Sequence, residues 1–201
     1  LSLEDAYRQI NLADSLLSND YDRAGAYFYK GIVNGMVQNY KTAIEDYDRA
    51  LIMDSTLLLA YINRAMVTAE MIEHQFMQQK FASSVTITWG ENEPGQADET
   101  PDKPDYTDAL AFLSMAIHID PDVPFAWFNR ANIKNKNRDY DGAIQDYNRA
   151  IELLDTFAEA YFNRGLTYIL LDKNAQACRD LSKAGELGLE SAYRVIQRYC
   201  N

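Results

Sequence analysis

The chain has 201 residues, of which 24% are charged, and its formal net charge is −11. This acidity argues against a nucleic acid partner, because binding to a phosphate backbone needs clustered lysine and arginine. The simplest interpretation of the charge is that it keeps the protein soluble. No apolar run approaches the length of about 18 residues that a membrane span needs, so no membrane span is predicted.

The ends of the chain bear on its compartment. The sequence begins at Leu1 without a signal peptide, and we interpret it as a trimmed fragment from the cytoplasm or from a bacterial cell envelope. Near the other end lie the two cysteines of the chain, Cys178 and Cys200, too far apart to form a Cys-x-x-Cys pair. This spacing does not suit a metal site. We expect either a disulfide in an exported protein or two buried thiols.

One pattern, Ala-x-x-x-(Ile, Tyr or Leu)-x-x-Ala, occurs five times and predicts the architecture. The last three copies follow one another at equal steps of about 34 residues, a fixed period that indicates a solenoid, in which each unit contacts mainly its neighbours. The step from Ala43 to Ala109 is one period plus an insertion almost as long as the period itself, and the step from Ala6 to Ala43 is slightly longer than the period. The copies are Ala6-Ile10-Ala13, Ala43-Tyr47-Ala50, Ala109-Leu113-Ala116, Ala143-Tyr147-Ala150 and Ala177-Leu181-Ala184.

Small and large residues alternate around these alanines, as they do where helices pack closely. Ala131 and Ala143 let two antiparallel helices approach, while Trp127 and Tyr147 fill the space between them. In these residues and their spacing the chain resembles the tetratricopeptide repeat family, in a bacterial-type form. Two further copies of the family pattern are Tyr27-Gly31-Tyr40-Ala43-Tyr47-Ala50 and Tyr161-Gly165-Tyr168-Ala177-Leu181-Ala184.

The resemblance implies an all-α fold, a right-handed superhelix of helix pairs that forms a single domain over residues 1–201. It opens with a leading half-repeat helix and closes with a C-terminal capping helix. The expected segments are the half-repeat helix at 1–19, repeat 1 at 20–56, repeat 2 at 57–123 with an insertion at about 74–105, repeat 3 at 124–157, repeat 4 at 158–188 and the capping helix at 189–201.

The insertion begins in an extended first helix. That helix starts near Ala60 and meets no stop signal before Gln79. The stretch 81–88 alternates and contains β-branched residues, which predicts a strand. The following stretch 90–105 is rich in Gly, Pro and acidic residues and predicts a loop. Trp89 would be an anchor if the insertion borders a binding face; otherwise the insertion is a tolerated surface excursion.

The family's leucine position carries a basic residue in every repeat. If buried, each cation needs a partner, because an unpaired internal charge is costly. Recurring aspartates on the second helices are the candidates, either from the same repeat or from the preceding one. We expect structural salt bridges rather than anion sites. The basic residues are Lys30, Arg64, Arg130 and Arg164, and the aspartates are Asp46, Asp146 and Asp180.

Nothing in the sequence predicts an enzyme or a cofactor. The motifs for phosphate loops, dinucleotides, serine hydrolases and zinc proteases are missing, and the chain has only two histidines. The family's carboxylate clamp is not expected either, because Phe28 and Ile32 occupy the positions of its lysine and asparagine.

The resemblance implies that first helices line a concave groove for an extended peptide. Asparagine carboxamides placed one repeat apart can donate to and accept from a peptide backbone; alternatively they serve solubility or local hydrogen bonds. The candidate groove residues are Phe28, Tyr29, Ile62, Asn63, Met66, Phe128, Asn129, Asn132, Phe162, Asn163 and Leu166.

The predicted function is therefore a protein–protein interaction scaffold that binds a protein or peptide segment in this groove. Two alternatives stay open at this point. The chain is a self-associating structural module, which would make it a homo-oligomer, or it is the docking or regulatory part of a larger protein.

Overall fold

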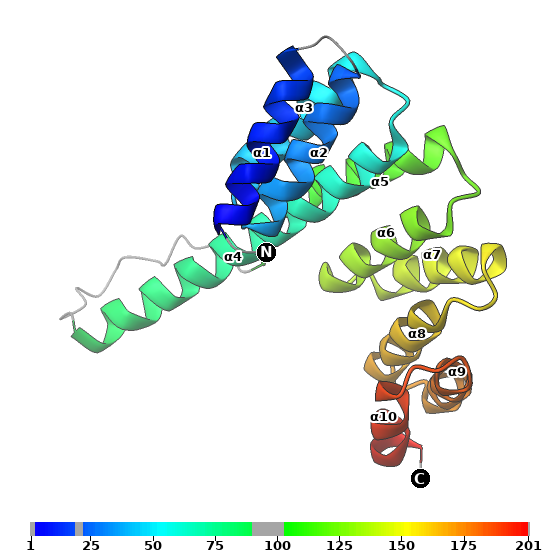
Figure 1. Ribbon diagram of the computed structural model, residues 1–201. Helices are drawn as coiled ribbons and strands as arrows, with labels where there is room; N and C mark the ends of the chain where they lie inside the picture. Colours follow the sequence, from blue (N-terminus) through cyan, green and yellow to red (C-terminus); the bar gives the residue numbers. More distant parts are fainter. Residues whose placement is uncertain (1–2, 19–21, 90–102, 201) are drawn as a thin grey trace. The chain divides into compact units, whose positions relative to one another are not determined.

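The computed structural model describes residues 3–18, 22–89 and 103–200. Within these ranges the chain is all-helical, as the family resemblance implies, and contains no strand (Figure 1). The helices are α1 (Leu3–Ser18), α2 (Arg23–Met36), α3 (Tyr40–Met53), α4 (Leu58–Trp89), α5 (Thr107–Ile119), α6 (Pro124–Lys136), α7 (Tyr140–Leu153), α8 (Ala158–Leu170), α9 (Asn174–Glu186) and α10 (Ser191–Tyr199).

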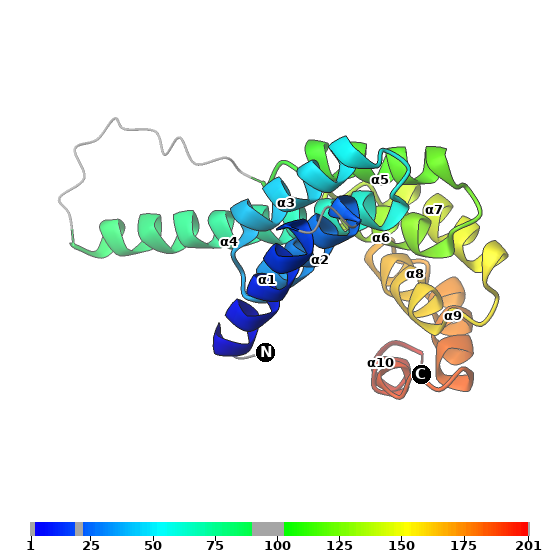
Figure 2. The ribbon, with the colours of Figure 1, turned by 45° about the horizontal axis from the view of Figure 1, so that its top comes forward.

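The helices form two compact units, unit 1 at residues 1–109 and unit 2 at residues 110–201. In unit 1, α1 packs on α2, α2 on α3 and α3 on α4; in unit 2, each helix from α6 to α10 packs on the next (Figures 1 and 2). The boundary falls inside α5, within the predicted second repeat. The assignment of residues 1–201 to a single domain and the repeat boundaries therefore stay predictions.

Fully buried alanines bring the helices of each pair together. In unit 1, Ala43 and Ala50 are 0% exposed, and Tyr47 between them is 2% exposed. A methyl group at Gly31 of α2 would lie 2.6 Å from the Tyr47 ring, so the first helix needs its glycine here. The same alternation of small and large residues buries Ala143, Tyr147 and Ala150 in unit 2.

Residues whose numbers differ by 100 occupy equivalent positions in the two units. Helix α3 spans residues 40–53 and α7 spans residues 140–153, while α4 and α8 begin at residues 58 and 158. The turns before α3 and α7 also match, because Gln38 and Arg138 both have left-handed φ, at 61° and 65°.

The strand predicted at residues 81–88 is wrong. Helix α4 continues without interruption to Trp89, and both views show it extending past α2 and α3 (Figures 1 and 2). No glycine or proline occurs between Leu58 and Trp89. Once a packed helix is established, adding one residue costs little, so a few β-branched residues do not stop it.

The remaining predictions for the insertion lie mostly outside the described residues. Residues 90–102 fall there, as does the side chain of Trp89. At the far end, the Asp105 carboxylate accepts hydrogen bonds from the Thr107 backbone N–H at 3.0 Å and from the Thr107 hydroxyl at 2.6 Å. This contact begins α5.

Helix α10 covers the last helix pair. Ala192 is fully buried, and Tyr193 lies against Gly185, where an added methyl group would come within 2.9 Å of the tyrosine ring. A disulfide joins Cys178 of α9 to Cys200, directly after α10, with the two Cα atoms 5.7 Å apart. The bond attaches the closing helix covalently to the helix that it covers.

Reduction of this disulfide is expected to destabilise unit 2. Closing the loop between Cys178 and Cys200 restricts the unfolded chain, which corresponds to about 3 kcal/mol. Urea unfolding followed by circular dichroism, with and without reductant, measures the change. The double variant Cys178→Ser and Cys200→Ser is the control and should not respond to reductant. Equal midpoints for the oxidised and reduced wild type would contradict the prediction.

Candidate functional site

Two of the four repeated cations are held by the aspartate of their own repeat. Arg130 donates two hydrogen bonds of 2.8 Å each to Asp146, from Nε to Oδ2 and from Nη2 to Oδ1. Arg164 grips Asp180 in the same way at 2.7 and 2.8 Å. The carboxylates are at most 10% exposed, so the ion pairs are internal. They hold the two helices of a pair together and take no part in an open anion site.

Each of these arginines also contacts the residue sixteen positions earlier in the chain. Arg130 Nη1 donates to the Ser114 hydroxyl at 3.2 Å, and Arg164 Nη1 donates to the Asn148 side chain at 2.7 Å. Arg64 also pairs with the residue sixteen positions earlier, and here the contact is an ion pair with Asp48 at 2.7 Å. Its second partner is Asp108 at 2.7 Å, because Phe112 stands at the sequence position of the recurring aspartate.

Asp46 pairs with one cation, Arg49, whereas its equivalent Asp146 pairs with both Arg130 and Lys134. It accepts from Asn34 Nδ2 at 2.9 Å and from Arg49 Nη1 at 3.2 Å. Lys30 forms its ion pair with Asp14 instead, at 2.7 Å. Burial raises the pKa of Asp46 above its usual value, although the positive charges of Lys30 and Arg49 and the Asn34 hydrogen bond oppose this rise.

Neutralising these two equivalent aspartates should have unequal effects. Asp146→Asn leaves Arg130 and the neighbouring Lys134, 2.8 Å from the carboxylate, without a counter-charge, which should cost about 3 kcal/mol. Asp46→Asn should cost about 1 kcal/mol or less at neutral pH, because it removes a charge whose burial is itself unfavourable. Urea unfolding of the two variants and the wild type tests this.

The pH dependence of Asp46 provides a second readout. A raised native pKa means that the folded state binds this proton more tightly than the unfolded state. The wild type should therefore gain stability relative to Asp46→Asn as the pH falls from neutral through that pKa. A difference that shrinks or reverses with falling pH would contradict this prediction.

In unit 2, the predicted asparagines form a hydrogen-bonded network between α6, α7 and α8. Asn132 Oδ1 accepts from the Tyr147 hydroxyl at 2.6 Å and from Asn163 Nδ2 at 2.9 Å. Asn135 Nδ2 donates to the Thr167 hydroxyl at 2.6 Å. Burial raises the pKa of Tyr147 to about 12, so the phenol stays protonated and can donate.

This network leaves polar atoms at the surface of the first helices. Among the described residues, Asn163 Oδ1 and Asn132 Nδ2 have no hydrogen-bond partner, and the half-buried Asn129 makes no hydrogen bond. The network therefore fixes the orientation of these two carboxamides and leaves one acceptor, Asn163 Oδ1, and one donor, Asn132 Nδ2, without a partner in the described residues. Asn129 of α6, one helix pair earlier than Asn163 of α8, adds a further carboxamide.

The aromatic and aliphatic candidates lie closer to the core than predicted. Phe28 packs on Tyr47 and Phe128 on Tyr147, each with ring centroids 6.0 Å apart. Phe162 and Leu166 are half-buried on α8. Ile62 is 5% exposed, because its short side chain stays below the surface that longer aromatic rings partly reach, and its role as a ligand contact stays a prediction.

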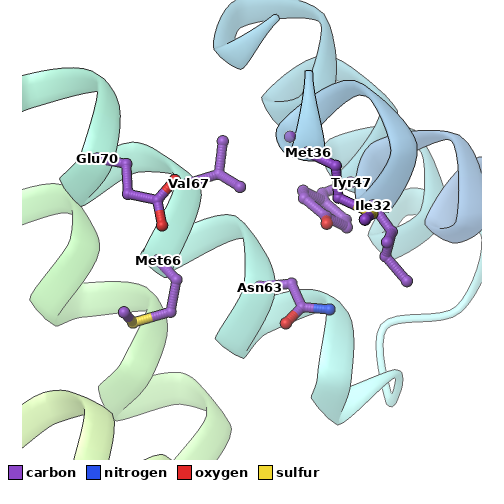
Figure 3. Close-up of a pocket in the computed structure, with 8 residues that line it drawn as sticks. Ile32, Met36, Tyr47, Asn63, Met66, Val67 and Glu70 are labelled. Atoms are coloured by element: carbon purple, nitrogen blue, oxygen red, sulfur yellow. The ribbon is translucent and has the colours of Figure 1, made fainter. Parts of the chain in front are cut away.

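In unit 1, two of the candidates line a hollow of about 260 Å³ between α2, α3 and α4 (Figure 3). Tyr29 lies apart from it, with its hydroxyl donating to Gln9 of α1. Sequence reasoning singled out Asn63 and Met66 but missed the other six residues of the hollow. Its lining is Ile32, Gly35, Met36, Tyr47, Asn63, Met66, Val67 and Glu70.

Other kinds of site find no support in the described part of the chain. No group of three or more His, Cys, Asp or Glu residues there has the arrangement of a metal site. None of the helices described combines the length and apolar character that crossing a membrane requires.

Comparison with known proteins agrees with the helix-pair architecture. A TPR repeat family model matches residues 132–172, and a second model, described as tetratricopeptide repeat, matches residues 158–187. Residues 132–187 thus carry tetratricopeptide repeats. The matched segments cover the end of α6 and all of α7, α8 and α9, where the alanine pattern recurs at its regular period without interruption.

The relatives in sequence match about half of this chain. A FAM10 family protein of Arabidopsis thaliana is 30% identical over 102 residues, which are 51% of this chain and 23% of the relative. Human tetratricopeptide repeat protein 36 is 32% identical over 96 residues, which are 46% of this chain and 51% of the relative. The chain thus spans about half or less of these relatives.

Solved structures share the fold over nearly the whole chain. A crystal structure of MamA has a TM-score of 0.66 at 18% identity, covering 96% of this chain and 98% of that one. A MamA fragment from Desulfovibrio magneticus RS-1 has a TM-score of 0.60 at 14% identity, covering 90% and 94%. At these identities the likeness concerns the arrangement of tetratricopeptide helices.

Proposed function

We propose that this chain is a protein-interaction module that binds an extended peptide segment of a partner protein along the first helices of its repeats. The observation that carries the proposal is the network around Asn132 in unit 2. It holds two carboxamides in fixed orientations and leaves Asn163 Oδ1 and Asn132 Nδ2 available. A peptide backbone offers N–H and C=O groups that match such a donor and acceptor.

The net charge of the chain limits which classes of partner it can bind. At a net charge of −11, a nucleic acid is disfavoured and a neutral or basic segment of protein is favoured. We also propose that the chain itself has no catalytic role. The sequence carries no motif for nucleotide binding or hydrolysis, and pairing of side chains within the fold accounts for its buried charges.

Selection from a random decapeptide library tests the binding proposal. Peptides enriched on the immobilised protein should bind in calorimetric titrations, and the double variant Asn129→Ala and Asn163→Ala should bind them about 30-fold more weakly. This loss corresponds to two hydrogen bonds of about 1 kcal/mol each. Because Asn163 also supports Asn132, we expect a loss of about 1 kcal/mol in folding stability as well.

Gln145→Ala is the matched control, because it removes an exposed carboxamide from α7, a second helix. It should leave peptide affinity unchanged. Failure to enrich any peptide would contradict the proposed function, as would equal affinity of the wild type and the double variant for the enriched peptides.

A further inference from the structure

The hollow in unit 1 exists because three residues of the unit 2 network have been replaced. Asn132, Asn135 and Thr167 of unit 2 correspond to Ile32, Gly35 and Val67 of unit 1. In unit 2, Asn135 bridges to Thr167 across 2.6 Å. Glycine at position 35 has no side chain to make this bridge, and valine offers no hydroxyl. A methyl group added at Gly35 would lie 3.1 Å from Val67 Cγ2, so α2 and α4 meet here without the polar bridge, and the hollow lies beside this contact.

The replacement also leaves two polar side chains, Tyr47 and Asn63, without the hydrogen bonds that their equivalents make in unit 2. Tyr47 is only 2% exposed, yet its hydroxyl makes no hydrogen bond to any described residue, whereas the Tyr147 hydroxyl donates to Asn132. The Asn63 carboxamide likewise has no partner in the described ranges, whereas Asn163 donates to Asn132. Tyr47 and Asn63 both line the hollow, and Asn63 is half-buried, so a ligand in the hollow can supply the missing partners.

A negative charge completes the lining. Glu70, the last residue of the hollow along α4, is exposed and makes no ion pair within the described part of the chain. Burial raises the pKa of Tyr47, and the negative charges of Asp46 and Glu70 raise it further. The Glu70 carboxylate therefore acts electrostatically on the phenol that the hollow contains, and Figure 3 shows both among its lining residues.

The other walls are apolar. Ile32 and Met36 come from α2, and Met66 and Val67 come from α4 (Figure 3). Two methionines suit a flexible aliphatic chain, because their unbranched thioethers adapt to its shape. The hollow thus combines an aliphatic wall with three oxygen acceptors: the Glu70 carboxylate, the Tyr47 hydroxyl and the Asn63 carbonyl.

We propose that this hollow is a subsite for a lysine side chain of the bound peptide. The aliphatic stem of lysine packs along Met36, Met66 and Val67. Its ammonium group carries three donors and no acceptor, which matches the acceptors of the hollow. An acidic side chain would be repelled by Glu70, and a purely apolar one would leave Tyr47 and Asn63 unpaired. The inference rests on the proposed function, and adds to it a residue preference in unit 1.

Methyl NMR of the protein labelled with ¹³C at its methionine methyl groups tests the subsite. The probe is Ala-Ala-Lys-Ala-Ala, blocked at both ends. The signals of Met36 and Met66 should shift saturably, while those of Met53 and Met115, which do not line the hollow, should stay in place. The same peptide with norleucine in place of lysine should bind at least tenfold more weakly.

Two variants and one control localise the effect. Glu70→Gln should weaken lysine-peptide binding about tenfold. The double change Gly35→Asn and Val67→Thr installs the unit 2 bridge and should abolish the shifts. Glu152→Gln removes an equally exposed charge from α7 and should change nothing. Because Glu70 is exposed, its replacement tests the subsite without endangering the fold.

Equal binding of the norleucine peptide, or unchanged binding by Glu70→Gln, would overturn the lysine subsite. So would unmoved Met36 and Met66 signals in a protein that still binds its library-selected peptide, and in that case the proposed function would stand. Loss of both the methyl shifts and all peptide binding would overturn the two proposals together.

Discussion

Close packing of alanine-lined second helices against the first helices is the constraint on which the structure depends. Ala43 and Ala143 are completely buried, and Tyr47 and Tyr147 fill the space beside them. Helices this close leave no room for water between them. Every polar group at the seam must therefore find its partner within the protein, or remain unpaired at a cost. This constraint decides both where the ion pairs lie and where a binding site can form.

The basic residue of each repeat shows the first consequence. A guanidinium near the seam is tolerated in unit 2 because a carboxylate one helix later binds it through two hydrogen bonds. Where phenylalanine occupies the aspartate position, Arg64 takes Asp48 and Asp108 instead. At Asp46 the buried charge is the carboxylate. Burial raises its pKa, and its positive and hydrogen-bonding neighbours only partly oppose that rise. The same backbone thus carries differently balanced charges, which we expect to give the helix pairs different responses to pH.

The second consequence is that equivalent positions in the two units form a closed hydrogen-bonded network in one and a hollow in the other. Around Tyr147, side-chain amides and a hydroxyl satisfy one another and bind three helices together. Around Tyr47, isoleucine, glycine and valine replace that network, and a hollow with unpaired polar atoms takes its place. Neither arrangement alters the alanine contacts of the fold. A repeat protein can therefore change what a repeat binds by substituting residues one layer above the seam, with the scaffold preserved.

The sequence by itself determined the helix pairs and their period, because alanines and aromatic residues at fixed intervals report packing contacts within one pair. It also predicted the pairing of buried cations with recurring aspartates, which holds for Arg130 and Arg164, and the long helix that begins near Ala60. Its strand at residues 81–88 was wrong, because local β-propensity is weaker than the propagation of a packed helix. Only the tertiary structure decided which aspartate each cation chose, that Ile62 lies below the surface, and that Gly35 leaves a hollow beside Tyr47. These outcomes depend on contacts among side chains from three different helices. The spacing of residues along the sequence does not specify such contacts.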